Sequence, residues 1–284
     1  MKAWDPYPWL EGERIHQLGA RVVVKCPVKN GGSFVAKKVD GMGGHIEGQA
    51  NMMRYAIQVA GVKVPRPHRV ERHGERIRVL VMNFDDGLPL DRVWPELGPT
   101  DKDLLAKELE AQIRRMRCHK MPLIGRVDEN GKAESKVTFL DPYRPQIATS
   151  CTAFASESEF DAHKVDQLRD RDPDAALKLQ QQIKTLRPSY TNKFVLTHGD
   201  LSPRNIHVKR SPKNERGASW HISAIFDWER SGFFPEYMEY VQARHNTAHN
   251  TEWHDFFVGL LERMNLGCSE TRIEVEDLAT FHVL

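Results

Sequence analysis

The chain has 284 residues, of which 40% are hydrophobic and 28% charged, a composition typical of a globular protein with one large domain or two lobes. Its formal net charge is only +2, so the strongly basic surface of a dedicated nucleic-acid-binding protein is not expected. No apolar run approaches the roughly 20 residues that span a bilayer, and the four cysteines include no C-x-x-C pair that would indicate zinc. We therefore expect a cytoplasmic protein without nucleic-acid or membrane partners.

Strand patterns dominate the first 84 residues. Four segments rich in β-branched or apolar residues predict strands: 14–18, 21–26, 33–39 and 77–84. Asn30-Gly31-Gly32 separates the second from the third and predicts a hairpin turn. From Ile46 to Ala60, apolar residues recur at helical spacing. Residues 1–84 are therefore expected to form an N-terminal lobe built on an antiparallel sheet.

Helical patterns become more frequent after the fourth strand. Thr100 is a suitable N-cap for the apolar helical pattern that follows it. Asp172-Pro173 predicts the start of another helix, with proline at its first position, whereas the glycine and prolines of residues 129–150 predict a loop. Residues 85–284 are expected to form a mainly helical C-terminal lobe, which makes the whole chain a two-lobed α+β fold.

The stretch HGDLSPRNIHV, at residues 198–208, carries the chemistry of the chain. A second strand, 220–226, follows it after a polar turn and ends on Asp227. Because a hairpin returns the chain to where it started, we expect Asp200, Asn205 and Asp227 to meet at one end of two strands. Carboxylate and amide oxygens are ligands that suit Mg²⁺, so Asn205 and Asp227 are the candidate metal ligands. Asp200 is left to orient or deprotonate a substrate hydroxyl.

H-G-D-L-x-x-x-N at residues 198–205, together with D-W-E at 227–229, resembles the aminoglycoside phosphotransferase and choline kinase-like family of the protein-kinase-like fold. In that family, H-G-D stands where protein kinases have H-R-D, and the D-W-E aspartate stands where they have D-F-G. Residues 232–237, GFFPEY, resemble a segment common in fungal members. The resemblance implies a two-lobed kinase-like fold, ATP and Mg²⁺ as cofactors, and phosphoryl transfer to a hydroxyl of a small molecule.

The resemblance also implies a strand lysine that contacts the α- and β-phosphates, and a helix glutamate that holds this lysine. Lys38 is the preferred lysine, with Glu47 at the start of the next helix as its partner. Ala36 shares a strand face with Lys38 and would lie against the adenine. Lys25, at the end of a valine run, remains the alternative to Lys38.

The same resemblance places the link between the lobes at Met82-Asn83-Phe84, so that Met82 and Phe84 would lie beside the adenine. Only Leu18-Gly19-Ala20 stands where a glycine-rich loop would cover the phosphates. Within the loop around Asp200, His198 is expected to brace the backbone, and Glu229 is expected to be a surface or supporting residue. Three residues of the acidic C-terminal segment are candidates for contacts to an aminoglycoside- or amino-alcohol-like acceptor: Glu252, Trp253 and Asp255.

The predicted function is therefore ATP- and Mg²⁺-dependent phosphorylation of a small-molecule hydroxyl. A protein acceptor is not expected, because the segment at 233–236 follows Asp227 within nine residues and leaves no room for an activation loop. The alternative is a pseudokinase, a nucleotide- or partner-binding module without turnover, which the sparse glycine loop favours. A metal-dependent hydrolase that uses His198, Asp200 and Asp227 is a second, weaker alternative.

Overall fold

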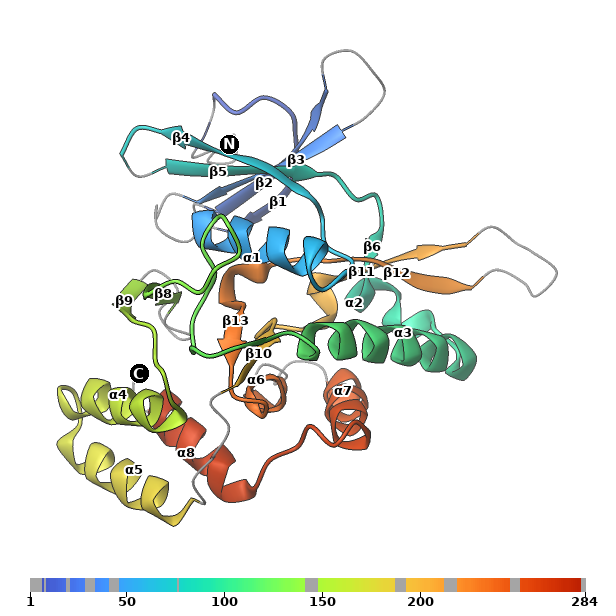
Figure 1. Ribbon diagram of the computed structural model, residues 1–284. Helices are drawn as coiled ribbons and strands as arrows, with labels where there is room; N and C mark the ends of the chain where they lie inside the picture. The colour runs from blue at the N-terminus through green and yellow to red at the C-terminus, as the bar shows by residue number, and fades with distance from the viewer. Residues whose placement is uncertain are drawn as a thin grey trace, which may run out of the picture.

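Antiparallel sheets and helices occupy different parts of the chain in the structure, which is a computed structural model (Figure 1). It describes residues 7, 9–18, 21–28, 34–40, 46–75, 77–140, 148–186, 193–211, 219–245 and 251–281. The α-helices are α1 (Ile46–Gln58), α2 (Leu90–Val93), α3 (Pro99–Arg117), α4 (Glu157–Arg169), α5 (Pro173–Thr185), α6 (Met238–His245), α7 (Thr251–Arg263) and α8 (Glu270–Phe281). The α+β class expected from the sequence is confirmed.

The N-terminal part of the chain is built on a sheet with the strand order β1-β2-β3-β5-β4. Its strands are β1 (Glu13–Leu18), β2 (Arg21–Pro27), β3 (Phe34–Asp40), β4 (Pro67–His73) and β5 (Ile77–Asn83). The four expected strands are all present, although the Asn30-Gly31-Gly32 turn lies outside the described residues. Strand β4 was not expected, because its sequence PHRVERH is mostly charged and exposed, as suits a sheet edge.

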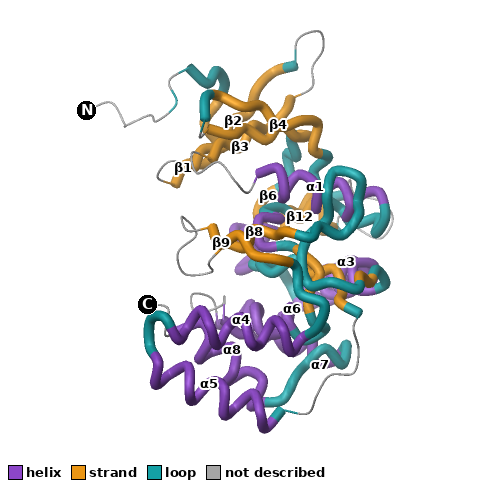
Figure 2. Tube along the Cα trace, turned by 60° about the vertical axis from the view of Figure 1, so that its left-hand side comes forward, coloured by secondary structure: helices purple, strands orange, loops and turns teal. Residues whose placement is uncertain are grey.

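The two faces of this sheet belong to different hydrophobic cores. Three residues of β2 are buried on the outer face: Val22, Val24 and Cys26. The alternate residues of β2 lie half-buried on the inner face: Arg21, Val23 and Lys25. Helix α1 covers this inner face, where its apolar residues share a core with Ala36, Leu80 and Met82 (Figures 1 and 2). Inner-face side chains of β2 and β3 therefore point toward the rest of the chain.

Helix α1 confirms the helical pattern that begins at Ile46. Ile46, Ala50 and Met53 are buried at helical spacing. The helix ends where Gly61 adopts a φ of +62° and the Val62 N–H donates to the Ala56 carbonyl at 2.9 Å. A left-handed glycine with such a return bond is a common way for a helix to terminate.

Two small sheets carry the HGD stretch in the rest of the chain. In one, β10 (Phe194–Thr197) lies between β7 (Lys120–Met121) and β13 (Gly232–Phe234). In the other, β11 (Ile206–Arg210) lies between β6 (Leu88–Pro89) and β12 (Trp220–Ile225). A further hairpin joins β8 (Lys136–Leu140) to β9 (Ala148–Thr152), so the loop expected at 129–150 was partly wrong. The division into lobes at 1–84 and 85–284 stays a prediction.

The helix starts follow local capping chemistry. Helix α5 begins as expected, because the Asp172 carboxylate accepts the Ala175 N–H at 2.9 Å. Helix α3, by contrast, begins at Pro99 with Gly98 as its N-cap, so the assignment of Thr100 as N-cap was wrong. Helix α4 was not expected; Ser156 caps it by accepting the Glu159 N–H.

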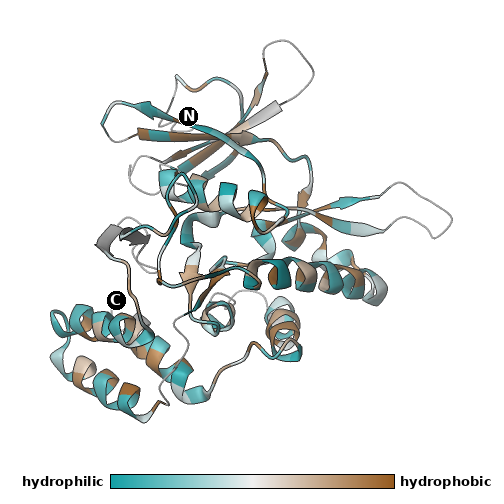
Figure 3. Cartoon of the chain, viewed as in Figure 1, coloured by the Kyte–Doolittle hydropathy of each residue, from teal (hydrophilic) through white to brown (hydrophobic). Residues whose placement is uncertain are grey.

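Apolar residues line the central strands and alternate with polar residues around the helices (Figure 3). Among the described residues, no helix combines the length and the apolar character needed to cross a membrane.

Candidate active site

His198 braces the loop that follows β10. Its Nδ1 accepts the Asp200 backbone N–H at 3.1 Å, and its Nε2 lies 2.8 Å from the Phe226 carbonyl oxygen. Because one ring nitrogen accepts and the other faces an acceptor, the ring fits the neutral form that is protonated on Nε2. His198 is fully buried. Its two hydrogen bonds join the loop to the segment before Asp227.

Glu239 of α6 fixes the same loop from the other side. Its carboxylate accepts the His198 N–H at 2.8 Å and the Gly199 N–H at 3.2 Å. Burial raises the pKa of Glu239 above its usual value, although both N–H groups favour the charged form. Gly199 has a φ of +80°, and a Cβ there would lie 3.0 Å from the Arg230 carbonyl oxygen, so the loop requires glycine at this position.

Asp200 is buried, and its two carboxylate oxygens differ in their hydrogen bonds. Its Oδ2 accepts a hydrogen bond from Arg204 at 2.8 Å. Its Oδ1 is buried and has no hydrogen-bond partner among the described residues. Buried carboxylate oxygens are normally hydrogen-bonded, so a free one at this position suits the hydroxyl of a ligand.

The structure brings Asn205 and Asp227 to the same end of the β11–β12 hairpin. Ile206 pairs with Ile225, and the Phe226 N–H donates to the Asn205 carbonyl at 2.7 Å. The Asn205 side chain also donates to the Asp200 carbonyl at 3.0 Å. These contacts place Asp200, Asn205 and Asp227 in one neighbourhood.

Asp227 lies at a sharp turn of the backbone. Its φ of 62° and ψ of 56° are left-handed, a conformation that aspartate tolerates better than most residues but that still stores strain. The 3₁₀ turn η3 (Trp228–Arg230) follows, and the buried Trp228 indole donates to the Ile225 carbonyl at 2.9 Å. This packing holds the strained turn and directs the carboxylate toward β3.

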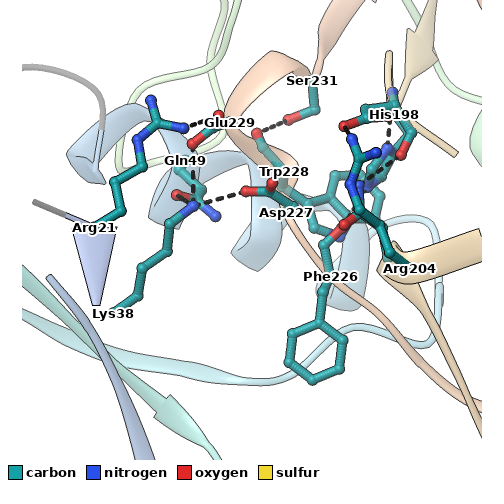
Figure 4. Close-up of polar contacts among 12 residues, drawn as sticks. Arg21, Lys38, Gln49, His198, Arg204, Phe226, Asp227, Trp228, Glu229 and Ser231 are labelled. Carbon is teal, nitrogen blue, oxygen red and sulfur yellow. Dashed lines mark hydrogen bonds and ion pairs between the residues drawn. The ribbon is translucent and has the colours of Figure 1, made fainter. Parts of the chain in front are cut away.

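Lys38 of β3 meets the acidic residues of this turn. Its Nζ lies 2.6 Å from Asp227 Oδ1, 3.1 Å from Glu229 Oε2 and 3.4 Å from Gln49 Oε1 (Figure 4). Burial by itself would lower the pKa of Lys38, but the Asp227 and Glu229 carboxylates outweigh it and raise this pKa well above its usual value. The pKa of Asp227 is lowered, since Lys38 outweighs the effect of burial. Both groups are therefore charged at neutral pH.

Glu47 does not pair with Lys38, which corrects the expectation from the sequence. The Glu47 Oε1 atom instead lies 3.2 Å from Arg78 and 3.3 Å from Arg72, both on the sheet. Gln49, two residues further along α1, is buried and faces Lys38 in its place. Glu229, which was not expected to be a site residue, supplies a carboxylate partner together with Asp227.

The proposed adenine-binding residues lie on the inner face of the sheet. Ala36 pairs with Met82 on one side and with Lys25 on the other, and directly opposed residues of antiparallel strands point the same way. Lys25 lies 4.7 Å from the centre of the Phe84 ring. Lys25 thus points toward the link between the sheet and the helical part, whereas Lys38 points toward Asp227.

Asn205 and Asp227 fit a magnesium ion that keeps most of its water. Mg²⁺ is usually held by one or two protein oxygens, with phosphates and waters completing its shell. Among the described residues, no group of three or more His, Cys, Asp or Glu side chains forms a metal cage. The Asn205 amide oxygen and the Asp227 carboxylate, which lies against Lys38, match the sparse donor set of a magnesium–nucleotide site.

Two of the three candidate acceptor residues of the C-terminal segment have other partners in the structure. Trp253 is fully buried and packs against Trp94 and Phe257. Glu252 forms an ion pair with Lys102 of α3. These two residues therefore do not form an acidic acceptor pocket.

A pocket of about 480 Å³ lies at the far end of β10 from the loop that carries His198 and Asp200. Phe194, the first residue of β10, lines this pocket, whereas the loop follows Thr197, the last residue. Strands rise by about 3.3 Å per residue, so roughly 10 Å separate the pocket from the loop. The pocket is not part of the candidate active site.

Comparisons with known proteins show a family and a shared fold. The model of the phosphotransferase enzyme family, APH, matches residues 29–262. No curated protein sequence matches the chain. The comparisons do not test the likeness of residues 232–237 to fungal members, which stays an expectation.

Several solved structures share the fold. A complex of a thermostable mutant of aminoglycoside phosphotransferase APH(4)-Ia with ADP and hygromycin B aligns with a TM-score of 0.65 and 12% identity, over 96% of this chain and 84% of that one. A type VIII aminoglycoside-3'-phosphotransferase aligns with a TM-score of 0.55 and 18% identity, over 96% of this chain and 92% of that one. A streptomycin–ATP complex of APH(2")-IIa aligns with a TM-score of 0.52 and 10% identity, over 92% of this chain and 85% of that one. Since the family model covers most of the chain, we conclude that the chain belongs to the phosphotransferase enzyme family and is a small-molecule kinase by class.

Proposed function

We propose that the protein transfers the γ-phosphoryl group of ATP, together with Mg²⁺, to a hydroxyl group of a small molecule. The observation that carries this proposal is the free Oδ1 of buried Asp200, in a loop that hydrogen bonds tie to Asn205 and to the residue before Asp227. Asp200 would act on the hydroxyl in the same site in which Asn205 and Asp227 would hold the metal ion and Lys38 would contact the phosphates.

The nucleotide would lie along the inner face of the sheet. Ala36, Met82 and Phe84 would contact the adenine, which places the phosphates toward Lys38. Two of the structures that share the fold contain ADP or ATP, which supports nucleotide binding here. Asn205 and Asp227 would hold the ion, and the charge of Mg²⁺ neutralises the phosphates during transfer.

Asp200 would act on the acceptor. The hydroxyl oxygen forms a bond to the γ-phosphorus while the bond from phosphorus to the β–γ bridging oxygen breaks, and ADP leaves. The hydroxyl proton passes to Asp200 Oδ1, while the hydrogen bond from Arg204 keeps Oδ2 in place. Transfer is direct and needs no phosphoenzyme.

Aminoglycosides and amino alcohols are the acceptors we propose to test first. Hygromycin B and streptomycin occur in complexes of proteins with this fold. Because Glu252 and Trp253 do not form the expected acidic pocket, neutral sugars belong in the same panel.

The test is a transfer assay with purified protein, Mg²⁺ and ATP labelled in its γ-phosphate. We expect a labelled product from the wild type, and a loss of at least about a thousandfold in Asp200→Asn, since this variant cannot accept the proton. Asp166→Asn, which changes an exposed aspartate of α4, is the matched control and should stay active.

Two outcomes would contradict the proposal. An Asp200→Asn variant as active as the wild type would remove Asp200 from the chemistry. A wild type that transfers nothing to any acceptor of the panel, but is thermally stabilised by ATP, would favour the pseudokinase alternative.

A further inference from the structure

Arg21 is the first residue of β2 and lies on the same face of the sheet as Lys38. Val23 of β2 pairs directly with Lys38 of β3, and Arg21 is two residues before Val23. Residues in this diagonal relation have their Cβ atoms about 7–8 Å apart and point to the same side. The long side chains of Arg21 and Lys38 can therefore reach one common target.

That common target is Glu229. Arg21 Nη1 lies 2.9 Å from Glu229 Oε1, and Lys38 Nζ lies 3.1 Å from Glu229 Oε2. Figure 4 shows the two cationic side chains extending alongside each other from neighbouring strands toward η3. The Arg21 side chain is 28% exposed and that of Glu229 only 10%, so the guanidinium lies on the solvent side of this pair.

The formal charges of this cluster balance one another. Arg21 and Lys38 face two carboxylates, those of Asp227 and Glu229. When Asp227 serves a metal ion, only Glu229 remains to balance the two cations. The excess positive charge then lies where the phosphates of a nucleotide would enter.

We propose that Arg21 binds the β- and γ-phosphates of the nucleotide alongside Lys38, an inference that rests on the proposed function. The sequence before β2 contains a single glycine, Gly19, rather than the several glycines of a glycine-rich phosphate loop. A guanidinium supplies several donors in a planar fork that matches phosphate oxygens. Arg21 would thus supply phosphate-binding donors that a glycine-rich loop supplies from its backbone.

The test measures how affinity depends on the number of phosphates. Binding of adenosine, AMP, ADP and ATP in the presence of Mg²⁺ is followed by calorimetry for the wild type, Arg21→Ala and Arg21→Lys. We expect Arg21→Ala to lower the affinity for ATP and ADP at least tenfold. The affinity for AMP should fall less, and the affinity for adenosine should change less than twofold. Arg21→Lys should recover part of the loss. The exposed Arg69→Ala on β4 is the control and should bind all four ligands like the wild type.

The dependence on phosphate number also distinguishes phosphate binding from a merely structural role of the Arg21–Glu229 pair. If the pair were only structural, Arg21→Ala would lower the melting temperature of the protein and weaken the binding of adenosine and ATP to the same extent. An Arg21→Ala loss that is the same for adenosine and ATP would overturn the inference. A wild type that binds no nucleotide would overturn the proposed function, and this inference with it.

Discussion

Lys38 is held by carboxylates that belong to the other half of the chain. Asp227 and Glu229 follow β12, whereas Lys38 lies on the N-terminal sheet, yet their charged atoms lie 2.6 Å and 3.1 Å apart. A buried lysine without partners would lose its proton readily. Here the two carboxylates raise its pKa, against the effect of burial, so that Lys38 keeps the charge that phosphate binding would require.

Alanine substitutions distinguish Lys38 from Lys25, the two candidates for the phosphate-binding lysine that the sequence left open. Lys38→Ala should lower kcat/KM for ATP by at least about a hundredfold, because it removes the cation that faces Asp227. Lys25→Ala should lower it less than about fivefold, because Lys25 points toward Phe84. Steady-state kinetics with ATP as the varied substrate measure both, and a larger loss in Lys25→Ala would reverse the assignment.

At the scale of elements, the segment after β5 is fastened to the hairpin that carries the site. Asp85 accepts the Gly87 N–H at 3.0 Å and the Ser223 hydroxyl of β12 at 2.8 Å, and it lies 2.7 Å from the Lys209 ammonium of β11. Strand β6 then pairs with β11. Movements of the sheet are thereby coupled to the β11–β12 hairpin, which Asn205 precedes and Asp227 follows.

Loss of this anchor should weaken the fold in a pH-dependent way. Asp85→Ala leaves buried donors unpaired and should lower the free energy of unfolding by about 1–3 kcal/mol at neutral pH. Burial alone would raise the pKa of Asp85, but hydrogen bonds from His207, Lys209 and Ser223 lower it below 3.8. The contribution is therefore fully present above that value and is lost as the pH falls through the lower, folded-state pKa.

Urea unfolding of Asp85→Ala and wild type at neutral pH and near pH 3 measures this effect. The difference between the two proteins should shrink in acid. Asp86→Ala, at an exposed carboxylate that also contacts Lys209, is the control and should change stability by less than about 1 kcal/mol. An equal effect of both variants would contradict the role of Asp85 as an anchor.

The sequence predicted those elements whose pattern is local. Four of the five strands of the sheet, the start of α5 at Asp172 and the hairpin that returns to Asp227 follow from residue order alone. The partner of Lys38 does not. Glu47 and Gln49 are about 200° apart around α1, and the packing of the helix on the sheet decides which of them faces the lysine. Glu229 was missed for a similar reason, because its direction depends on the left-handed turn at Asp227.

At the scale of the whole molecule, one continuous core joins the sheet to the helical part. Ala36 and Leu80 of the sheet belong to the same buried cluster as Ile206 and Trp228. The rings of Tyr55, on α1, and Phe233, on β13, meet edge to face at 5.4 Å. The ion pairs of Lys38 and Arg21 with the Asp227–Glu229 turn span the same boundary. Binding of a metal–nucleotide complex would therefore act on contacts that already join both parts.

The central claim is that Asn205 and Asp227 hold a metal ion beside the nucleotide phosphates. Its most direct test is the affinity for ATP, with and without Mg²⁺, of wild type, Asn205→Ala and Asp227→Ala, with adenosine as the control ligand. We predict that Mg²⁺ strengthens ATP binding to the wild type at least tenfold, that it has little effect in either variant, and that all three proteins bind adenosine equally. A full Mg²⁺ effect in both variants would contradict the account.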